Sequence, residues 1–244
     1  AVRPDDAPEP MTLLTDLAGY WNMDEATGSV RADATGNGWD LEEWSFVEAQ
    51  GVTGHIPVPQ TGGFFNSAVQ FEFGPGEALV SFAPNSLLAG DFTFACWFNY
   101  NSDEGFDGQG LISIGGTVWI GVRAYDAALN FGIKTDNENG YSQALTPNAS
   151  FLEYDWTHVA FVRKSGTLRI YVNGAECANA ALTGSIVPEA VGFFTETDLI
   201  VGINPWGYPL VGAVDELGCW QRALSAAEVS QLYNNGDGLA YELF

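Results

Sequence analysis

A loop rich in glycine, asparagine and aspartate is the first place in this chain where side chains could do chemistry. It runs from Asp33 to Asp40 with the sequence D-A-T-G-N-G-W-D. These residue types favour tight turns, but carboxylate and amide oxygens are also the ligands that Ca²⁺ prefers. The loop therefore predicts either a plain turn or a cradle of oxygen ligands for a metal ion.

Aromatic side chains with polar neighbours form a second candidate site, this time for a ligand. Alternation along residues 117–125 and along the next strand points one set of side chains outward: Trp119, Arg123, Tyr125, Asn130 and Lys134. The turn at residues 204–209 adds Trp206 and Tyr208. Aromatic faces beside hydrogen-bonding groups suit sugar rings, and they suit a protein interface equally well. The alternative is that Trp119 and Tyr125 face a second sheet, since large aromatic side chains are mostly buried.

Side chains for acid–base or nucleophilic catalysis are few. The two histidines are His55 and His158, and His158 lies in mid-strand, where a structural histidine is expected. Glu25 and the pair Glu42-Glu43 lie in turn-like stretches, and nothing in the sequence sets a catalytic separation for them. The chain has no G-x-S-x-G motif, no phosphate-binding glycine loop and no Cys/His metal spacing. We therefore expect a protein that is not an enzyme.

Short alternating segments must position these residues. The stretch from Trp156 to Gly174 holds two alternating runs around a turn, and its final Asn-Gly pair favours a type I′ turn into a third strand. Phe92 to Phe98 alternates in the same way. One short C-terminal helix is expected after the capping box at residues 225–228, ending near Asn234. Many short strands and one helix predict an all-β protein, a two-sheet antiparallel β-sandwich.

Composition limits the partners. The chain of 244 residues has 31 acidic against 8 basic side chains, a net charge of -23. Such a surface repels nucleic acid and anionic membranes, because binding phosphates requires clustered basic residues. No stretch approaches the roughly 18–20 apolar residues that a membrane span needs. Cys96, Cys177 and Cys219 allow at most one disulfide, and each lies in an apolar strand where a free buried thiol is expected.

The first sixteen residues differ from the rest of the chain. Residues 1–16 combine three prolines with acidic residues and predict an extended arm that stays mobile or docks onto a partner. Residues 17–244 are expected to form a single domain, because all-β sandwiches of this length are often one domain.

Four ordered segments resemble the concanavalin A-like, laminin-G-like jelly roll, in its LamG/pentraxin-like subgroup. They are L-A-G-Y-W-N-M-D-E with D-A-T-G-N-G, F-T-F-A-C-W-F, W-T-H-V-A-F-V with L-R-I-Y-V-N-G, and L-V-G-A-V-D-E-L with R-A-L-S-A-A-E-V-S-Q-L-Y. Their order and spacing match from about residue 17 to residue 238. The resemblance implies a jelly-roll fold over nearly the whole chain and says less about function.

The resemblance also implies a structural calcium ion near the rim of the sandwich. The matching oxygen donors are Asp33, Asn37 and Asp215, and Ca²⁺ would tie the last strand to the first loop. Glycosidases of related fold use closely spaced carboxylates of the E-x-D-x-x-E kind, and this pattern does not occur here.

The expected function is therefore recognition without catalysis. The first hypothesis is an extracellular or surface-exposed adhesion module that binds glycans or a protein surface through Trp119, Arg123, Tyr125, Asn130, Trp206 and Tyr208. The second is a structural decoration, fibre or appendage subunit of a virion or cell surface, assembled through residues 1–16. A polysaccharide-active enzyme is the weakest of the three.

Overall fold

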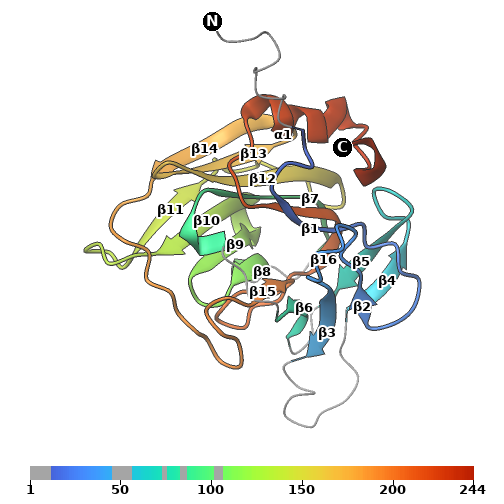
Figure 1. Ribbon diagram of the computed structural model, residues 1–244, viewed down its shortest axis with the longest axis horizontal. Helices are drawn as coiled ribbons and strands as arrows, with labels where there is room; N and C mark the ends of the chain where they lie inside the picture. Colours follow the sequence, from blue (N-terminus) through green and yellow to red (C-terminus); the bar gives the residue numbers. More distant parts are fainter. Residues whose placement is uncertain (1–11, 46–56, 73–75, 83–86, 102–106) are drawn as a thin grey trace, which may run out of the picture.

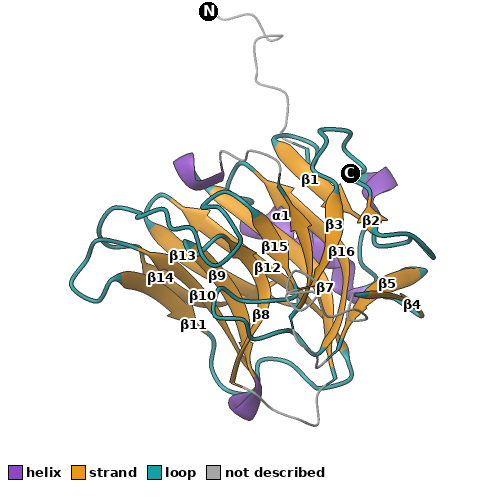
Figure 2. Cartoon of the chain, turned by 90° about the horizontal axis from the view of Figure 1, so that it is seen from below, coloured by secondary structure: helices purple, strands orange, loops and turns teal. Residues whose placement is uncertain are grey.

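The described residues form two antiparallel sheets of eight strands each, which pack face to face (Figures 1 and 2). The computed structural model describes residues 12–45, 57–72, 76–82, 87–101 and 107–244. Because the chain alternates between the two layers, both sheets contain strands from its beginning, middle and end. The predicted two-sheet β-sandwich is confirmed.

The first sheet has the order β14-β13-β12-β7-β16-β5-β4, and β1 also pairs with β16. Its strands are β1 (Leu17–Trp21), β4 (Val58–Thr61), β5 (Ser67–Phe71), β7 (Phe92–Tyr100), β12 (Trp156–Lys164), β13 (Thr167–Val172), β14 (Ala175–Ala181) and β16 (Gly212–Trp220). The meander β12-β13-β14 is the one that the sequence predicts. Its second turn has φ of 49° at Asn173 and 79° at Gly174, as a type I′ turn requires.

The second sheet has the order β11-β10-β9-β8-β15-β6-β3-β2. Its strands are β2 (Val30–Arg31), β3 (Leu41–Ser45), β6 (Glu77–Ser81), β8 (Asp107–Ile114), β9 (Val118–Arg123), β10 (Ala128–Lys134), β11 (Tyr141–Leu145) and β15 (Leu199–Val201). The sequence patterns described above predict β9 and β10 but not β3, β6 or β11. These three are only five residues long, and neighbouring strands supply most of the contacts that order such short segments.

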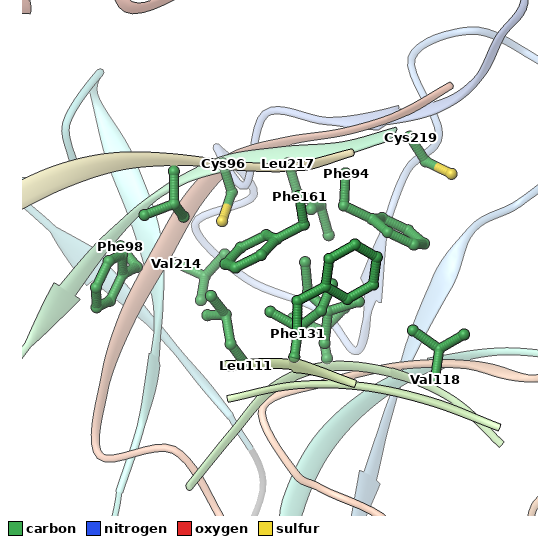
Figure 3. Packing of buried hydrophobic residues seen from close by; sticks show 14 of the residues in the cluster. Phe94, Cys96, Phe98, Leu111, Val118, Phe131, Phe161, Val214, Leu217 and Cys219 are labelled. Carbon is green, nitrogen blue, oxygen red and sulfur yellow. The ribbon is translucent and has the colours of Figure 1, made fainter. Parts of the chain in front are cut away.

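Alternate side chains of both sheets fill the space between them (Figure 3). Phe94, Cys96 and Phe98 enter from β7, and Phe161 enters from the neighbouring β12. Phe131 faces them from the second sheet, with its ring 6.0 Å from that of Phe161. All three cysteines are free thiols; those of β7 and β16 are buried, as the sequence predicts, and that of β14 is half-buried.

The outer faces of the two sheets are covered differently. Helix α1 (Ala226–Tyr233) packs on the outer face of the first sheet, where Val229 and Leu232 bury against Val162 and Trp220 (Figure 1). The outer face of the second sheet has a smaller apolar cluster built around Val80. Short 3₁₀ turns complete the described chain: η3 (Leu87–Ala89), η4 (Ala124–Asp126), η5 (Asn234–Gly236) and η6 (Tyr241–Leu243). None of the helices among the described residues has the length and apolarity needed to cross a membrane.

The last residues of the predicted N-terminal arm pack on this chain itself. Leu13 is 2% exposed, and its carbonyl accepts a hydrogen bond of 2.7 Å from the Trp220 indole. Arg222 donates to the carbonyls of Thr12 and Thr15 at 2.9 and 2.8 Å. Residues 12–16 thus contribute to the packed structure, whereas the rest of the predicted arm, residues 1–11, lies outside the described residues.

The capping box of α1 gives a test of the fold. Glu228 Oε2 accepts from the Ser225 backbone N–H at 2.7 Å, and Ser225 Oγ accepts from the Glu228 N–H at 3.3 Å. Ser225→Ala removes the second bond, so the free energy of unfolding should fall by about 1 kcal/mol. Urea denaturation measures this change. The matched control is Ser230→Ala on the exposed face of the same helix, and an equal loss in both variants would contradict a capping role.

Candidate functional site

The loop between β15 and β16 is held against the outer face of the second sheet by Asn204. Its Oδ1 accepts hydrogen bonds from the backbone N–H groups of Trp206 and Tyr208, each at 2.9 Å, and its Nδ2 donates to the carbonyl of Gly108. Gly110 permits this close approach, because a Cβ atom there would lie 1.9 Å from the Asn204 nitrogen. The loop is therefore a fixed platform for its two aromatic side chains.

Trp119 and Trp206 meet on this platform. Their ring centroids lie 5.4 Å apart with the planes at 71°. The Trp119 indole covers Gly132 on the neighbouring strand, where a Cβ atom would come within 2.1 Å of the ring. A hollow of about 120 Å³ opens beside the two indoles, and Asn130 and Tyr208 complete its polar lining. Aromatic rings and a few hydrogen-bonding groups thus line one concave surface, as in many ligand sites.

A larger hollow of about 360 Å³ lies on the other side of Trp206. Trp44 and Phe194 form one wall, with ring centroids 4.7 Å apart, and Phe193 lies 6.0 Å from Trp44. Ile203 also lines this hollow, which shares Asn204 and Trp206 with the smaller one. The sequence analysis does not predict the lining residues Trp44, Phe193, Phe194 and Ile203. The adjacent pair Phe193-Phe194 after a glycine is a signal in the sequence. The hollow itself forms only where four segments of the chain meet, namely Trp44, Gly76, residues 191–194 and residues 203–207.

Neither hollow is lined by a charged side chain among the described residues. This is unusual for a chain whose net charge is -23. Acidic side chains that approached a ligand here would favour cations, and basic ones would favour anions. The lining therefore suits an uncharged ligand.

The structure brings together four of the six predicted ligand residues: Trp119, Asn130, Trp206 and Tyr208 line the smaller hollow. The prediction that Trp119 points outward is confirmed, because its neighbours Val118 and Ile120 enter the core and Trp119 does not. The alternative interpretation, in which the Trp119 side chain packs against the opposite sheet, is therefore wrong.

Arg123, Tyr125 and Lys134 lie outside the lining of both hollows. Arg123 ends β9, forms an ion pair with Asp126 at 2.8 Å and lies 4.9 Å from the centre of the Tyr125 ring. Lys134 ends β10 and forms an ion pair with Glu189. Because both cations already have acidic partners, they add little net positive charge to the platform.

The first two predicted calcium ligands serve the backbone of their own loop. Asp33 Oδ1 accepts from the N–H groups of Tyr20 and Thr35 and from the Thr35 hydroxyl, and its Oδ2 accepts from the Trp39 N–H. Asn37 donates from Nδ2 to the carbonyl of Ala18 at 3.1 Å. Four donors on one carboxylate are what a turn-organising aspartate shows, so these two residues fit a turn better than a metal cradle.

The third predicted ligand, Asp215, has other neighbours. Its carboxylate accepts from the backbone N–H groups of Phe65 and Glu216, each at 2.9 Å, and the charge of Asp24 acts on it. Within the described ranges, no three His, Cys, Asp or Glu side chains gather closely enough to hold a metal ion. That search does not cover the amide of Asn37, so the calcium site at Asp33, Asn37 and Asp215 stays a prediction.

Two adjacent buried carboxyls on β16 have raised pKa values. Burial raises the pKa of Asp215 to about 8, and the charges of Glu216 and Asp24 add to the rise. Burial likewise raises the pKa of Glu216 to about 7, although the Tyr20 hydroxyl, which donates to this carboxylate, opposes the shift. Glu216 also has a φ of 52°, in a bulge where the pairing of β16 shifts register. These carboxyls belong to the junction of β1 and β16 and line neither hollow of the platform.

His158 is a structural residue, as the sequence predicts. It is 2% exposed on the outer face of the first sheet, between the rings of Trp97 and Tyr233. Burial lowers the pKa of its imidazole to about 3. The ring therefore stays neutral over the physiological pH range and does not exchange a proton there.

Comparison with known proteins identifies the family. Residues 75–230 match Laminin_G_3, the family of the concanavalin A-like lectin/glucanases superfamily. The match covers more than half of the chain, and the sandwich described above has the corresponding architecture. This protein belongs to that family. No characterised protein matches it by sequence comparison.

Solved structures share the fold at low sequence identity. The binding domain of Paraclostridial Mosquitocidal Protein 1 is 16% identical with a TM-score of 0.65, and the match covers 91% of this chain and 52% of that one. Domain 4 of AbnA, a GH43 extracellular arabinanase from Geobacillus stearothermophilus in complex with arabinotriose, is 17% identical with a TM-score of 0.58, covering 88% and 97%. Trypanosoma rangeli sialidase is 15% identical with a TM-score of 0.62, covering 98% and 36%. This chain thus spans about half of the binding domain of Mosquitocidal Protein 1 and nearly all of domain 4 of the arabinanase.

The raised pKa values on β16 predict how stability depends on pH. The folded protein holds these protons more tightly than the unfolded chain, whose aspartate and glutamate carboxyls have ordinary pKa values of about 3.8 and 4.5. The contribution to the free energy of unfolding is therefore complete below about pH 4 and is lost as the pH rises through about 7 to 8. We expect the free energy of unfolding, measured by urea denaturation with EDTA present, to decline between pH 5 and pH 8. Asp215→Asn should flatten it, whereas Glu138→Gln on the surface should not; an equally steep decline in Asp215→Asn would refute the assignment.

The predicted calcium ion is tested by thermal melting. If Ca²⁺ binds through Asp215, millimolar CaCl₂ raises the melting temperature at pH 8 above its value in EDTA, since a ligand that binds only the folded state stabilises it. Asp215→Asn should then abolish the difference, and Asp33→Asn should reduce it. Equal melting temperatures with CaCl₂ and with EDTA would contradict the prediction that this protein binds calcium.

Proposed function

We propose that this protein is a non-catalytic carbohydrate-binding module that holds an uncharged glycan on the outer face of its second sheet. The observation that carries the proposal is the meeting of Trp119 and Trp206, 5.4 Å apart, in a hollow that also contains Asn130 and Tyr208. Indole faces bury the apolar faces of sugar rings, and amide and hydroxyl groups bond their hydroxyls. The family and the fold of the arabinotriose-bound neighbour support this assignment.

Preorganisation supports the same reading. Asn204 holds the loop that carries Trp206, so little conformational freedom is lost when a ligand binds. Trp206 remains 62% exposed although its backbone is fixed. A large aromatic side chain held in solvent on a rigid loop is typical of a recognition surface, since it gains nothing for the fold by being exposed.

The uncharged lining narrows the class of glycan. A sialylated or uronic acid-rich chain would be repelled by a protein of net charge -23, and no described residue places a cationic side chain in either hollow to bind it. The two nearest basic residues of β9 and β10 are already paired with acids. We therefore infer a neutral glycan, met outside the cell or at a cell or virion surface.

Absence of catalysis is part of the proposal. Glycosidases need two carboxyl groups at a defined separation across the bond that breaks. Among the described residues, no Asp or Glu side chain lines either hollow. The carboxyls of β16 whose pKa values are raised belong to a different part of the sandwich. The hypothesis of a structural virion or surface subunit rests on the arm of residues 1–16. Residues 1–11 lie outside the described part, and the carbonyls of Thr12, Leu13 and Thr15 bond to this chain itself, so this hypothesis stays a prediction.

Binding by single-tryptophan variants tests the function. We expect a neutral polysaccharide from a panel of glucan, xylan, arabinan and galactomannan to bind in affinity electrophoresis and calorimetry, and polygalacturonate not to bind. Trp206→Ala and Trp119→Ala should each weaken binding about tenfold or more, because central aromatic side chains dominate binding energy. Phe82→Ala, which removes another exposed aromatic ring outside both hollows, is the matched control.

Two outcomes would contradict the proposal. Binding that survives both tryptophan substitutions would move the site elsewhere on the molecule. Release of reducing ends from any of these polysaccharides by the purified protein would make it an enzyme. Because electrostatics contributes little to binding a neutral glycan, affinity should also stay nearly constant between 50 and 500 mM NaCl, that is, over about a tenfold range of ionic strength.

A further inference from the structure

The larger hollow differs chemically from the smaller one beside it. Its volume is about 360 Å³, against about 120 Å³ for the hollow that contains Asn130 and Tyr208. The apolar side chains that line it are Trp44, Val191, Phe193, Phe194, Ile203, Pro205 and Trp206. The two hollows share Asn204 and Trp206 as lining residues and therefore lie side by side, so a molecule bound in one can reach the other across the exposed Trp206 ring.

Among the described residues, Asn204 has the one amide side chain that lines the larger hollow, and its amide already forms hydrogen bonds within the protein. Asn204 Oδ1 accepts two backbone N–H groups, and its Nδ2 donates to the Gly108 carbonyl. Apart from the indole N–H groups of Trp44 and Trp206, the described lining side chains offer no other hydrogen-bonding group. A sugar ring placed deep here would lose bonds from its hydroxyls to water, whereas an apolar group would gain by leaving water.

We propose that the larger hollow is an apolar subsite, which receives an uncharged alkyl, acyl or aryl group carried by the sugar in the smaller hollow. The ligand is then a neutral amphiphilic glycoconjugate. This inference rests on the proposed glycan site for the sugar end only. The apolar end rests on the lining of Val191, Phe194 and Ile203, on the wall formed by Trp44, and on Trp206, which lines both hollows.

Paired glycosides measure the contribution of the apolar group. Calorimetry compares methyl and octyl β-D-glucopyranoside, and the matching galactopyranosides, below the concentration at which the octyl compounds form micelles. We expect the octyl glycoside to bind about tenfold or more tightly than the methyl glycoside, which corresponds to burial of only a few methylene groups. Free 1-octanol, which lacks the sugar, should bind more weakly than the octyl glycoside.

Two variants separate the subsites. Val191→Asp puts a charge into the larger hollow and leaves the backbone pairing of Val191 with Phe194 intact, at 3.0 and 2.9 Å. It should abolish the advantage of the octyl chain and leave affinity for the methyl glycoside unchanged. Asn130→Ala should weaken the methyl glycoside and retain the octyl-to-methyl ratio. Val58→Asp, at an exposed valine of β4, is the matched control.

An uncharged fluorescent probe tests the apolar subsite without any sugar. N-phenyl-1-naphthylamine should brighten on binding to the protein and should lose this signal in Val191→Asp. A second variant, Phe193→Ala, should weaken the signal without adding a charge. Because Phe193 is 58% exposed, this change should leave the melting temperature nearly unaltered, so a lost signal would not be due to unfolding.

The possible failures are distinguishable. Equal affinities for methyl and octyl glycosides, with no probe binding, would overturn the apolar subsite and leave the glycan site standing. Octanol that binds as tightly as the octyl glycoside would show that the sugar contributes nothing, which overturns both the inference and the proposed function. An octyl advantage that survives Val191→Asp would place the alkyl chain elsewhere and so overturn the inference.

Discussion

Successive side chains of a strand point to opposite faces of its sheet, and this constraint determines the whole outer surface of the sandwich. Each residue that the core buries places its neighbour on an outer face. Val118 and Ile120 of β9 enter the core between the sheets, and the side chain of Trp119 between them must therefore point away from that core. On β12, the burial of Phe161 leaves Ala160 and Val162 to face α1. The packed interior thus also selects what the protein presents to a partner.

The two outer faces are completed in different ways. Helix α1 and the residues around Leu13 and Phe244 cover the first sheet with a second apolar cluster. The second sheet is covered in part by the loop that Asn204 anchors, and this loop leaves hollows on both sides of Trp206. A covered face stabilises the fold, whereas a partly covered and preorganised face can bind a ligand at small entropic cost.

Charge is distributed in accordance with this division. Buried carboxyls collect where β1 and β16 meet, and there Asp215 and Glu216 have pKa values raised by burial. No charged side chain among the described residues lines the two hollows on the second sheet. In the proposed function, this uncharged lining receives a neutral ligand, whereas the net charge of -23 on the chain would repel polyanions.

Local patterns in the sequence determined the sandwich class, the meander from β12 to β14, the capping box of α1 and the outward direction of Trp119. Each of these follows from side chains a few residues apart. Only the tertiary structure decided that Trp119 meets Trp206, that Trp44 closes a hollow with Phe194, and that Asp215 accepts a hydrogen bond from the Phe65 backbone. Those contacts depend on the order of strands within each sheet and on the close approach of Asn204 to Gly110. The physical reason is that a period of two specifies which face a side chain occupies, whereas its partners on that face come from strands and loops that the same pattern does not order.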